Sequence, residues 1–535
     1  MLTYHEVFCC ENEGKSMKVR NSITSKDEKL TNVQLRERWI NIDWKKVEKH
    51  VNRLQVRITK AVKEGKWYLV KRLQYLLTHS YYAKLYATRK TCQNTGKRTA
   101  GVDGETWSSS EAKIKAALSL TDKGYVAKPL KRVFIEKAGK KKKRPLGIPT
   151  MYDRAMQSLY ALALEPIAEA TGDRTSFGFR KFRSTHDACE QVFACLCGKH
   201  SPVWVLEGDI KGCFDNISHQ WLIDTIPMDK SVLKQFLKAG FIYESQLFPT
   251  EAGTPQGGII SPVLANMTLD GIEKLLADKY RNNKNGNRYS ELAAKNKVNF
   301  VRYADDFIVT AKTEEIANEV KDLIKDFLND RGLELSDEKT VITHIDNGFD
   351  FLGWNFRKYN GKLLVKPSKK SVDKFTEKIS EIIKRGKAWK QEDLIDELNP
   401  VIIGWANYHQ NVVSSETFRK LDSRIWNMLW HWATRRHQEK SNKWTADRYW
   451  HSEGNRKWVF SEGDKKLKCL SYTKIVRHTK LKLDMNPHLD KGYFILRKIK
   501  QGINKLESEA KSAWNKVKNV IKPENETMNN DCCPN

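Results

Sequence analysis

Two adjacent carboxylates, Asp305 and Asp306, lie between apolar runs of high β-propensity in the stretch NFVRYADDFIVTA (299–311). Burying unpaired charge is costly, so a chain that places two carboxylates there should supply a partner for them. A further acidic candidate, Asp209, follows the apolar run VWVL 96 residues before Asp305. If the two β segments pair in one sheet, all three carboxylates meet at one edge. Oxygen ligands around a gap of roughly 4 Å suit two hard divalent cations.

The simpler interpretation is a β-hairpin whose Asp-Asp tip faces water, because aspartate tolerates turn geometry. Two bound cations would instead activate a primer 3′-hydroxyl and stabilise a leaving pyrophosphate in an in-line displacement. The chain carries 95 Lys and Arg against 65 Asp and Glu, a formal net charge of +30. Such an excess is typical of proteins with a polyanionic partner, usually nucleic acid, although a merely basic soluble protein is the alternative.

Composition sets wider limits on the kind of protein. A chain of 535 residues is too long for one core and should form several domains, and its 40% hydrophobic content excludes a disordered polymer. No stretch approaches the roughly 18 apolar residues of a membrane span, and the N-terminus lacks the order of a secretory signal. The ten cysteines include no CxxC pair, so we expect neither a disulfide framework nor a complete zinc site. We expect the protein to work in a reducing cytoplasm.

The elements that must position these carboxylates change in type along the chain. Apolar residues recur at helical spacing over 47–62 and 67–77, which predicts a helical hairpin. The glycine-rich loop 94–104 leads into another helix. From about 125 to 360, short β-rich runs alternate with helical patterns, as in an α+β domain with locally paired strands. A helical pattern then returns, with a Trp-dense basic stretch at 389–458 and a lysine-rich tail.

Several motifs resemble those of a known family. YADD and the upstream DIKGCF (209–214) resemble the palm of reverse transcriptases, and GTPQGGIISPVLANMTLD (253–270) matches the family's PQG block. Further blocks match in order: RPLGIPTMYDRAMQ (144–157), SFGFRKFRSTHDA (176–188), LELSDEKT (333–340) and FDFLGWNF (349–356). Their order and spacing resemble those of group II intron-encoded reverse transcriptases, the maturases, from about residue 38 to about residue 495.

The resemblance implies an α+β fold: a right-hand polymerase of fingers and palm with an antiparallel palm sheet, a helical N-terminal extension and a helical thumb or maturase domain. The expected segments are a poorly ordered tail (1–36), the N-terminal extension (37–115), fingers and palm (116–360), thumb and maturase domain X (361–460) and a basic, DNA-binding-like C-terminal region (461–535). The last segment lacks the paired CxxC motifs and catalytic histidines of the HNH endonuclease found in some relatives. We therefore expect a remnant of that module without second-strand cleavage, with a disordered tail as the alternative.

For the metal site, the resemblance implies that Asp209, Asp305 and Asp306 hold two Mg²⁺ ions, with Mn²⁺ as a substitute, and that Ile210 offers a backbone carbonyl. Phe214 takes the place of the aromatic residue that crowds the sugar 2′ position and selects deoxynucleotides. An ordinary core phenylalanine is the alternative for this residue.

The resemblance also implies a nucleotide-binding set. Gln256 and Gly257 would line the nascent base pair, glycine allowing a close approach of the backbone. Lys137 and Arg144 would clamp the triphosphate, Arg144 through bidentate contact, and Lys339 would support the palm or the template. Two nearby positions, Glu136 and Lys181, depart from the proline that is common in the family, without touching the proposed chemistry.

Residues 399–437 resemble domain X, where interleaved aromatic and basic side chains can stack on bases and neutralise phosphate. A tryptophan stripe at helical spacing is more often core, so we assign most of the rings to packing. The basic residues are assigned to RNA: Arg419, Lys420, Arg424, Arg435 and Arg436.

The function implied by the resemblance is an RNA-directed DNA polymerase encoded by a group II intron, a mobile element. It would synthesise cDNA by two-metal nucleotidyl transfer and assist intron RNA splicing. Expected partners are intron RNA, template RNA, a DNA primer and dNTPs, and no membrane is expected. The protein would be part of a ribonucleoprotein in a bacterial cytoplasm. Its oligomeric state stays open, and a dimer is one alternative. An RNA-dependent RNA polymerase is disfavoured by Phe214, and an RNA-binding splicing cofactor without polymerase activity by the three intact aspartates. A domesticated reverse transcriptase in defence or repair stays open.

Overall fold

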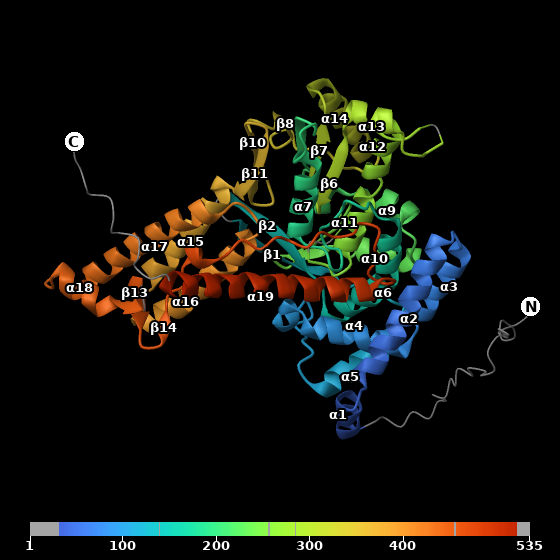
Figure 1. Cartoon of the computed structure of the whole chain (residues 1–535). Helices are drawn as coiled ribbons and strands as arrows, with labels where there is room; N and C mark the ends of the chain where they lie inside the picture. Colours follow the sequence, from blue (N-terminus) through green and yellow to red (C-terminus); the bar gives the residue numbers. More distant parts are fainter. Residues whose placement is uncertain (1–30, 138–139, 255–256, 284, 454–455, 522–535) are drawn as a thin grey trace, which may run out of the picture.

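The computed structural model describes residues 31–137, 140–254, 257–283, 285–453 and 456–521. Figure 1 shows a body of helices and sheets from which a bundle of helices extends to one side, with the last helix running back along both. Helices and strands are mixed throughout, as expected for an α+β fold. No helix in the described ranges is long and apolar enough to cross a membrane.

The N-terminal part is helical. Its elements are α1 (Asn32–Ile40), α2 (Trp44–Lys63), α3 (Trp67–Thr78), α4 (Tyr81–Gln93), the 3-10 turn η1 (Thr95–Arg98) and α5 (Ser110–Ser119). Helices α2 and α3 confirm the predicted helical hairpin. The expected irregular tail, 1–36, is wrong at its last residues, because Thr31 and Gln34 form a capping box that starts α1. Residues 1–30 lie outside the described residues.

A β-hairpin and two long helices follow. They are β1 (Leu130–Lys137), β2 (Lys140–Ile148), α6 (Met151–Thr171) and α7 (Thr185–Leu196). Strands β1 and β2 pair in antiparallel fashion, and β1 also pairs with β4 (Phe241–Tyr243), which continues into β5 (Gln246–Phe248). Helix α6 is buried along most of its length, so it forms the axis against which α2 and the following helices pack.

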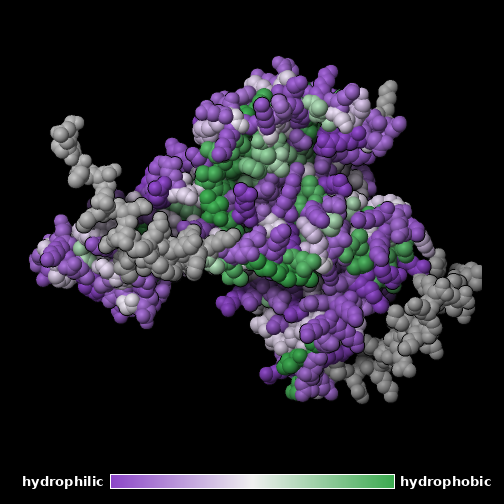
Figure 2. All heavy atoms as spheres, viewed as in Figure 1, coloured by the Kyte–Doolittle hydropathy of each residue, from purple (hydrophilic) through white to green (hydrophobic). Residues whose placement is uncertain are grey.

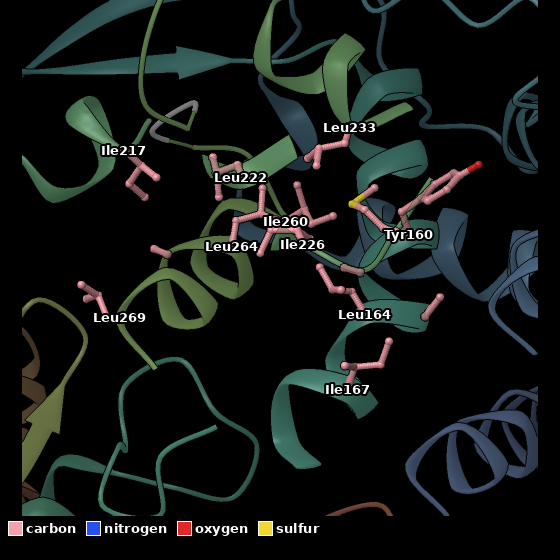
Figure 3. Packing of buried hydrophobic residues seen from close by; sticks show 14 of the residues in the cluster. Tyr160, Leu164, Ile167, Ile217, Leu222, Ile226, Leu233, Ile260, Leu264 and Leu269 are labelled. Carbon is pink, nitrogen blue, oxygen red and sulfur yellow. The ribbon is translucent and has the colours of Figure 1, made fainter. Parts of the chain in front are cut away.

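The central sheet has the strand order β6-β7-β3-β8, and all its pairs are antiparallel. Its strands are β3 (Trp204–Asp209), β6 (Asn299–Tyr303), β7 (Asp306–Ala311) and β8 (Val341–His344). The helices around it are α8 (Cys213–Asn216), α9 (His219–Thr225), α10 (Lys230–Leu237), α11 (Ser261–Leu269), α12 (Ile272–Tyr280), α13 (Ser290–Asn296) and α14 (Glu314–Asn329). One apolar core joins the sheet to these helices and to α6, and Figure 3 shows side chains of α6, α9 and α11 meeting in it.

The C-terminal half contains a short sheet, a helical bundle and a second short sheet. These are β9 (Phe349–Phe351), β10 (Trp354–Tyr359) and β11 (Lys362–Pro367), then α15 (Lys369–Arg385), α16 (Gln391–His409), α17 (Ser415–Arg436) and α18 (Asn442–Tyr449), then β12 (Trp450–Glu453), β13 (Arg456–Glu462) and β14 (Lys465–Lys466). Helices α15, α16 and α17 share one apolar core. The expectation of a purely helical domain misses the β12–β13–β14 sheet, whose strands are too short and polar to stand out.

The C-terminal segment folds back onto the central body through the turn η2 (Leu470–Tyr472) and helix α19 (Lys491–Ile521). Arg497 of α19 forms a buried ion pair with Asp187 of α7, and Phe494 stacks on Phe182 with ring centroids 5.0 Å apart. The predicted alternative of a disordered tail concerns the end of the chain with Cys532 and Cys533, which lies outside the described residues. Apolar residues of α19 also contribute to the hydrophobic area that Figure 2 shows on this face.

His409, the last residue of α16, lies at the junction between the bundle and the β9–β10–β11 sheet. It is fully buried, and its Nε2 lies 3.1 Å from the Ser371 hydroxyl. The neighbouring Tyr408 ring stacks on Trp354 at 4.6 Å and donates a hydrogen bond from its hydroxyl to the Leu352 carbonyl. Rings and hydrogen bonds thus fix the bundle on the body, around an imidazole without access to water.

This burial predicts an acid-sensitive junction. Burial, followed by His186, lowers the pKa of His409 to about 3. Below pH 6.5, the ordinary pKa of histidine, His409 takes up a proton in the unfolded chain but not in the folded chain. The free energy of unfolding therefore falls by about 2 kcal/mol by pH 5. We expect the melting temperature of the wild type to fall between about pH 7 and pH 5 by more than that of His409→Gln, measured by scanning fluorimetry. The exposed His431→Gln variant should follow the wild type, whereas identical pH profiles for all three proteins would contradict this assignment.

Candidate active site

The three predicted carboxylates lie at one edge of the central sheet. Asp209, the last residue of β3, is directly opposite Asp306, the first residue of β7. Tyr303 pairs with Asp306 across the β6–β7 hairpin, so Ala304 and Asp305 form its two-residue tip. The antiparallel register therefore brings together side chains that are almost a hundred residues apart in sequence.

The hairpin tip has an unusual backbone that its neighbours accommodate. Ala304 has a φ of 57°, which a two-residue hairpin turn requires and which residues other than glycine seldom adopt. Gly178 lies against this tip so closely that a Cβ atom there would be 2.2 Å from the Ala304 nitrogen. The segment SFGFR therefore packs directly on the tip, and only glycine fits at that position.

A buried arginine of β6, Arg302, holds the hairpin tip in place. The Arg302 side chain is fully buried and donates hydrogen bonds to the Ala304 carbonyl (3.2 Å), Asn266 Oδ1 (3.0 Å) and Asp270 Oδ1 (2.6 Å). Burial and the adjacent Asp270 raise the pKa of Asp173 to about 7. Sequence reasoning missed this network, although an arginine inside an apolar strand is itself a signal that a buried acid must lie nearby.

The carboxylate edge is short of positive charge. Burial, followed by repulsion from Asp305 and Asp209, raises the pKa of Asp306 to about 6. Burial also raises the pKa of Asp305, and Asp209 adds to this effect, whereas Arg144 and Lys339 oppose it. The Lys339 ammonium contacts Asp209 Oδ2. The charges of Lys339 and Arg144 together do not balance three carboxylates, so additional cations would be attracted to this edge.

The donor chemistry at this edge fits hard divalent cations, because every acidic ligand is an oxygen. No group of three His, Cys, Asp or Glu side chains among the described residues is arranged to hold a metal ion, however. The Lys339 contact explains part of this, since the ammonium takes one Asp209 oxygen. The three carboxylates are neighbours at the sheet edge, and their binding of cations stays a prediction.

A cleft of about 980 Å³ opens beside the carboxylates. The central sheet contributes Glu207, Asp209 and Asp306 to its wall, and the turn before β8 contributes Lys339. Helix α15 contributes Lys369, Lys370, Asp373, Lys374 and Glu377. Sequence reasoning gave these lysines no role beyond helical amphipathicity. Because acidic side chains outnumber lysines in the lining as a whole, the α15 lysines form only one basic wall of the cleft, where phosphates can bind.

The predicted nucleotide-binding residues fall partly beside this edge. Arg144 is exposed on β2 and lies near enough to lower the pKa of Asp305. Gly257 has a φ of 111°, and a Cβ there would lie 2.6 Å from the Gly147 carbonyl oxygen, so this loop packs on β2. Lys137 ends β1, and Gln256 lies outside the described residues.

Phe214 is half-buried, and both predicted interpretations have support. It packs against the central core, as a core phenylalanine would, and its ring meets that of Phe179 edge-on at 6.2 Å. Its carbonyl accepts a hydrogen bond from the Thr254 nitrogen at 2.7 Å, which fixes the start of the PQG block beside it. Ile210 is buried and forms a backbone bridge with Leu335.

All five predicted RNA-binding residues are exposed on α17. Two of them have partners within the protein: Lys420 pairs with Glu416, and Arg436 donates hydrogen bonds to the Lys387 and Trp389 carbonyls. The others, Arg419, Arg424 and Arg435, form no ion pair within the described residues. These three are therefore the better candidates for contact with phosphate.

Three family models match successive parts of the chain. The N-terminal domain of reverse transcriptase matches residues 39–120, the reverse transcriptase (RNA-dependent DNA polymerase) matches 135–356, and the group II intron maturase-specific domain matches 372–450. The protein YkfC of Escherichia coli K12 is 33% identical over 301 residues, which are 50% of this chain and 78% of that protein. The chain belongs to the group II intron reverse transcriptase and maturase family.

Other members of the family align over a smaller share of their length. The group II intron-encoded protein LtrA of Lactococcus lactis is 34% identical over 340 residues, which are 53% of this chain and 56% of LtrA. An uncharacterized 91 kDa protein in a cob intron of Schizosaccharomyces pombe is 30% identical over 322 residues, 51% of this chain and 39% of that protein. The chain thus spans about half the length of the group II intron-encoded protein LtrA. The carboxylate edge, the Arg302 anchor and the lysine-lined cleft lie within or next to the part that matches the reverse transcriptase model.

Proposed function

We propose that this chain is an RNA-directed DNA polymerase encoded by a group II intron. The observation that carries the proposal is the register that places Asp209 opposite Asp306 with Asp305 at the adjacent tip, within the segment that matches the reverse transcriptase model. In this reading the central sheet is the palm, the β1–β2 hairpin belongs to the fingers, and α15–α17 form the thumb. The segments would be 37–115, 116–360, 361–460 and 461–535, with the first helix starting earlier, at Asn32.

In the proposed mechanism, Asp209, Asp305 and Asp306 hold two divalent cations, Mg²⁺ by the chemistry of the ligands, with Mn²⁺ as a substitute. Such ions activate the attacking hydroxyl and stabilise the leaving group when bound. Arg144, with Lys137, binds the triphosphate oxygens, and its charge faces Asp305 in the free protein. Lys339 neutralises Asp209 before the cations enter and then supports the template. Gly257, next to Gln256, keeps the backbone close to the nascent base pair.

The lysines of α15 complete the proposed polymerase. They line the wall of the cleft opposite the carboxylates, where they would contact the phosphates of a primer and template. A primer–template duplex bound in this cleft would have its primer end next to the carboxylate edge, because the α15 lysines and the carboxylates line the same cleft.

The same protein is proposed to act as a maturase on its intron RNA. The match of 372–450 to the group II intron maturase-specific domain supports this, as does the exposed basic face of α17. Arg419, Arg424 and Arg435 would contact RNA phosphates, whereas Lys420 and Arg436 also serve the fold. The protein would then work as a ribonucleoprotein with intron RNA.

The experiment that tests the polymerase is primer extension by the purified full chain on poly(rA)/oligo(dT) with dTTP. We expect incorporation with Mg²⁺ or Mn²⁺ and none after chelation, followed by recovery when the cation is restored. A folded protein that binds the primer–template but incorporates no dTTP with either cation would overturn the proposal and favour a splicing cofactor without polymerase activity.

Sugar selection gives a prediction for Phe214. If its half-buried ring closes the space around the sugar 2′ position, Phe214→Ala should raise kcat/KM for UTP relative to dTTP by about tenfold or more, which corresponds to about 1.4 kcal/mol. Single-nucleotide incorporation on the same primer–template measures this ratio. Phe179→Ala, which removes the neighbouring ring, is the matched control and should leave the ratio near the wild-type value. An unchanged ratio in Phe214→Ala would leave Phe214 as a core residue only.

A further inference from the structure

A cavity of about 440 Å³ lies between α17 and the β12–β13–β14 sheet, in the bundle that Figure 1 shows extending from the body. Its walls are largely aromatic, with polar groups at the edge. The residues used below are Asp422, Trp426, Trp450, Trp458, Phe460 and Lys468. None of them belongs to the carboxylate site or to the residues predicted to bind RNA.

Tryptophan rings surround this cavity on several sides. Trp426 stacks on Trp430 with centroids 5.4 Å apart and an interplanar angle of 9°. Trp450 lies 5.8 Å from Trp426, and Trp458 meets Trp426 nearly edge-on at 6.2 Å. Trp450 is buried, whereas 52% of Trp458 is exposed. The cavity therefore has a packed aromatic floor and one large ring at its mouth.

The exposed ring is held there by a costly backbone conformation. Trp458 has a φ of 67°, a region in which glycine is the usual residue. The β12–β13 register shifts between His451 and Glu453, and the resulting bulge in β13 includes Trp458. A bulge turns a side chain away from its regular direction, and a bulky residue in this conformation costs about 1–3 kcal/mol. Such strain persists only where the surrounding structure holds it in place, and it often occurs at binding sites.

The floor contains an unsatisfied donor. The indole Nε1–H of Trp450 is buried and has no hydrogen-bond acceptor among the described residues. A buried donor without an acceptor costs about 1–3 kcal/mol. This donor is out of reach of a ligand in the cavity, so it reflects the tight packing of the floor and is not a hydrogen-bonding group of the site.

The charges around the cavity indicate which ligands fit. The Asp422 carboxylate is engaged, since it accepts hydrogen bonds from the backbone nitrogens of Leu470 and Ser471, each 2.9 Å away. A cationic ligand would therefore meet no free carboxylate from Asp422. The exposed side chain of Lys468, at the edge of the cavity, forms no ion pair within the described residues. An anionic backbone can lie at the mouth while its planar group enters the cavity.

We propose that this cavity, the tryptophan pocket, binds one unstacked nucleobase of a single-stranded nucleic acid. The base stacks on Trp458 and meets Trp426 edge-on, and Lys468 contacts a flanking phosphate. Aromatic stacking of this kind contributes about 1–3 kcal/mol per base. Because RNA and DNA share this chemistry, both are tested, and the proposal does not depend on polymerase activity.

Photo-crosslinking locates the base. Oligouridylate of about ten nucleotides, in ribo and deoxy forms with 5-iodouracil bases, is irradiated with the full-length protein, and the adducts are mapped by mass spectrometry. We expect adducts on Trp458 or Trp426, and the form that gives them identifies the nucleic acid. The same adducts should form in an Asp305→Ala background, so a failure of the polymerase proposal leaves this result intact. Absence of adducts at both tryptophans with both oligomers would overturn the proposal.

Affinity measurements use a variant, Trp458→Gly, that should stay folded, because glycine readily adopts the positive φ at this position. Trp458→Gly suits the positive φ, so its melting temperature should equal or exceed that of the wild type. Its affinity for oligouridylate, by fluorescence anisotropy, should fall about 5- to 100-fold, whereas its affinity for an abasic oligomer of the same length should not change. The matched control is Trp444→Ala, an exposed tryptophan of α18 that packs on His437 outside the pocket, and it should bind like the wild type. Equal affinity of Trp458→Gly and the wild type for oligouridylate would refute the pocket.

Discussion

Asp305→Ala should lower the rate of dTTP incorporation on poly(rA)/oligo(dT) by about a thousandfold or more, with Asp209→Asn and Asp306→Asn close behind. Preorganised charge at a reacting phosphoryl group is worth several kcal/mol, and each lost carboxylate would remove a ligand from the proposed cation site. Steady-state and single-turnover primer extension measure the loss. The matched control is Asp326→Asn, an exposed aspartate on α14, which should keep wild-type activity.

Stability separates this effect from damage to the fold. Burial and the neighbouring carboxylates raise the pKa of Asp306 to about 6, so the ionised group is disfavoured in the folded protein without cations. Removing the charge with Asp306→Asn should therefore leave the melting temperature equal or higher at about pH 8, while activity is lost. An Asp306→Asn protein that polymerises at the wild-type rate would refute the assignment of this edge as the catalytic site. The assignment would also be refuted if Asp306→Asn lost activity only because its melting temperature fell below the assay temperature.

The sequence predicts the sheet edge well, because strand alternation and the YADD hairpin are local signals. Asp209 and Asp306 meet as expected, since antiparallel pairing of β3 with β7 leaves their ends at one edge. The helical hairpin of α2 and α3 follows equally from apolar spacing. The hairpin and the helices depend on residues close in sequence or on a periodic pattern, whereas the meeting of Asp209 with Asp306 was expected only on the condition that the two β segments pair in one sheet.

Features that depend on long-range pairing of polar groups were not predicted. The ion pair of Asp187 with Arg497 joins residues 310 positions apart, and no local pattern marks either residue as buried. The contact of Lys339 with Asp209 likewise depends on the turn after α14 reaching the end of β3. The bulge at Trp458 leaves no glycine in the sequence to signal a positive φ. Tertiary structure determines all three.

Arg302 is such a long-range feature, and its replacement should have the second-largest effect. In Arg302→Met the buried Asp270 carboxyl loses its partner, and breaking a buried ion pair in this way costs about 3–5 kcal/mol. We expect a clear fall in the midpoint of urea denaturation. Polymerase activity, measured well below the melting temperature, should fall as well, because the Ala304 carbonyl loses the donor that holds the hairpin tip beside Asp209.

A double variant distinguishes positioning from stability. Adding Asp270→Asn to Arg302→Met removes the uncompensated charge, so stability should recover in part, with a coupling free energy of about 0.5–3 kcal/mol in the double-mutant cycle. Activity should not recover, since the tip still lacks its anchor. Arg302→Lys keeps a charge but not the planar guanidinium that reaches both Asn266 and Asp270. Its stability should lie between that of Arg302→Met and that of the wild type. If the stabilised double variant polymerised at the wild-type rate, Arg302 would serve the fold alone and the tip would hold its position without it.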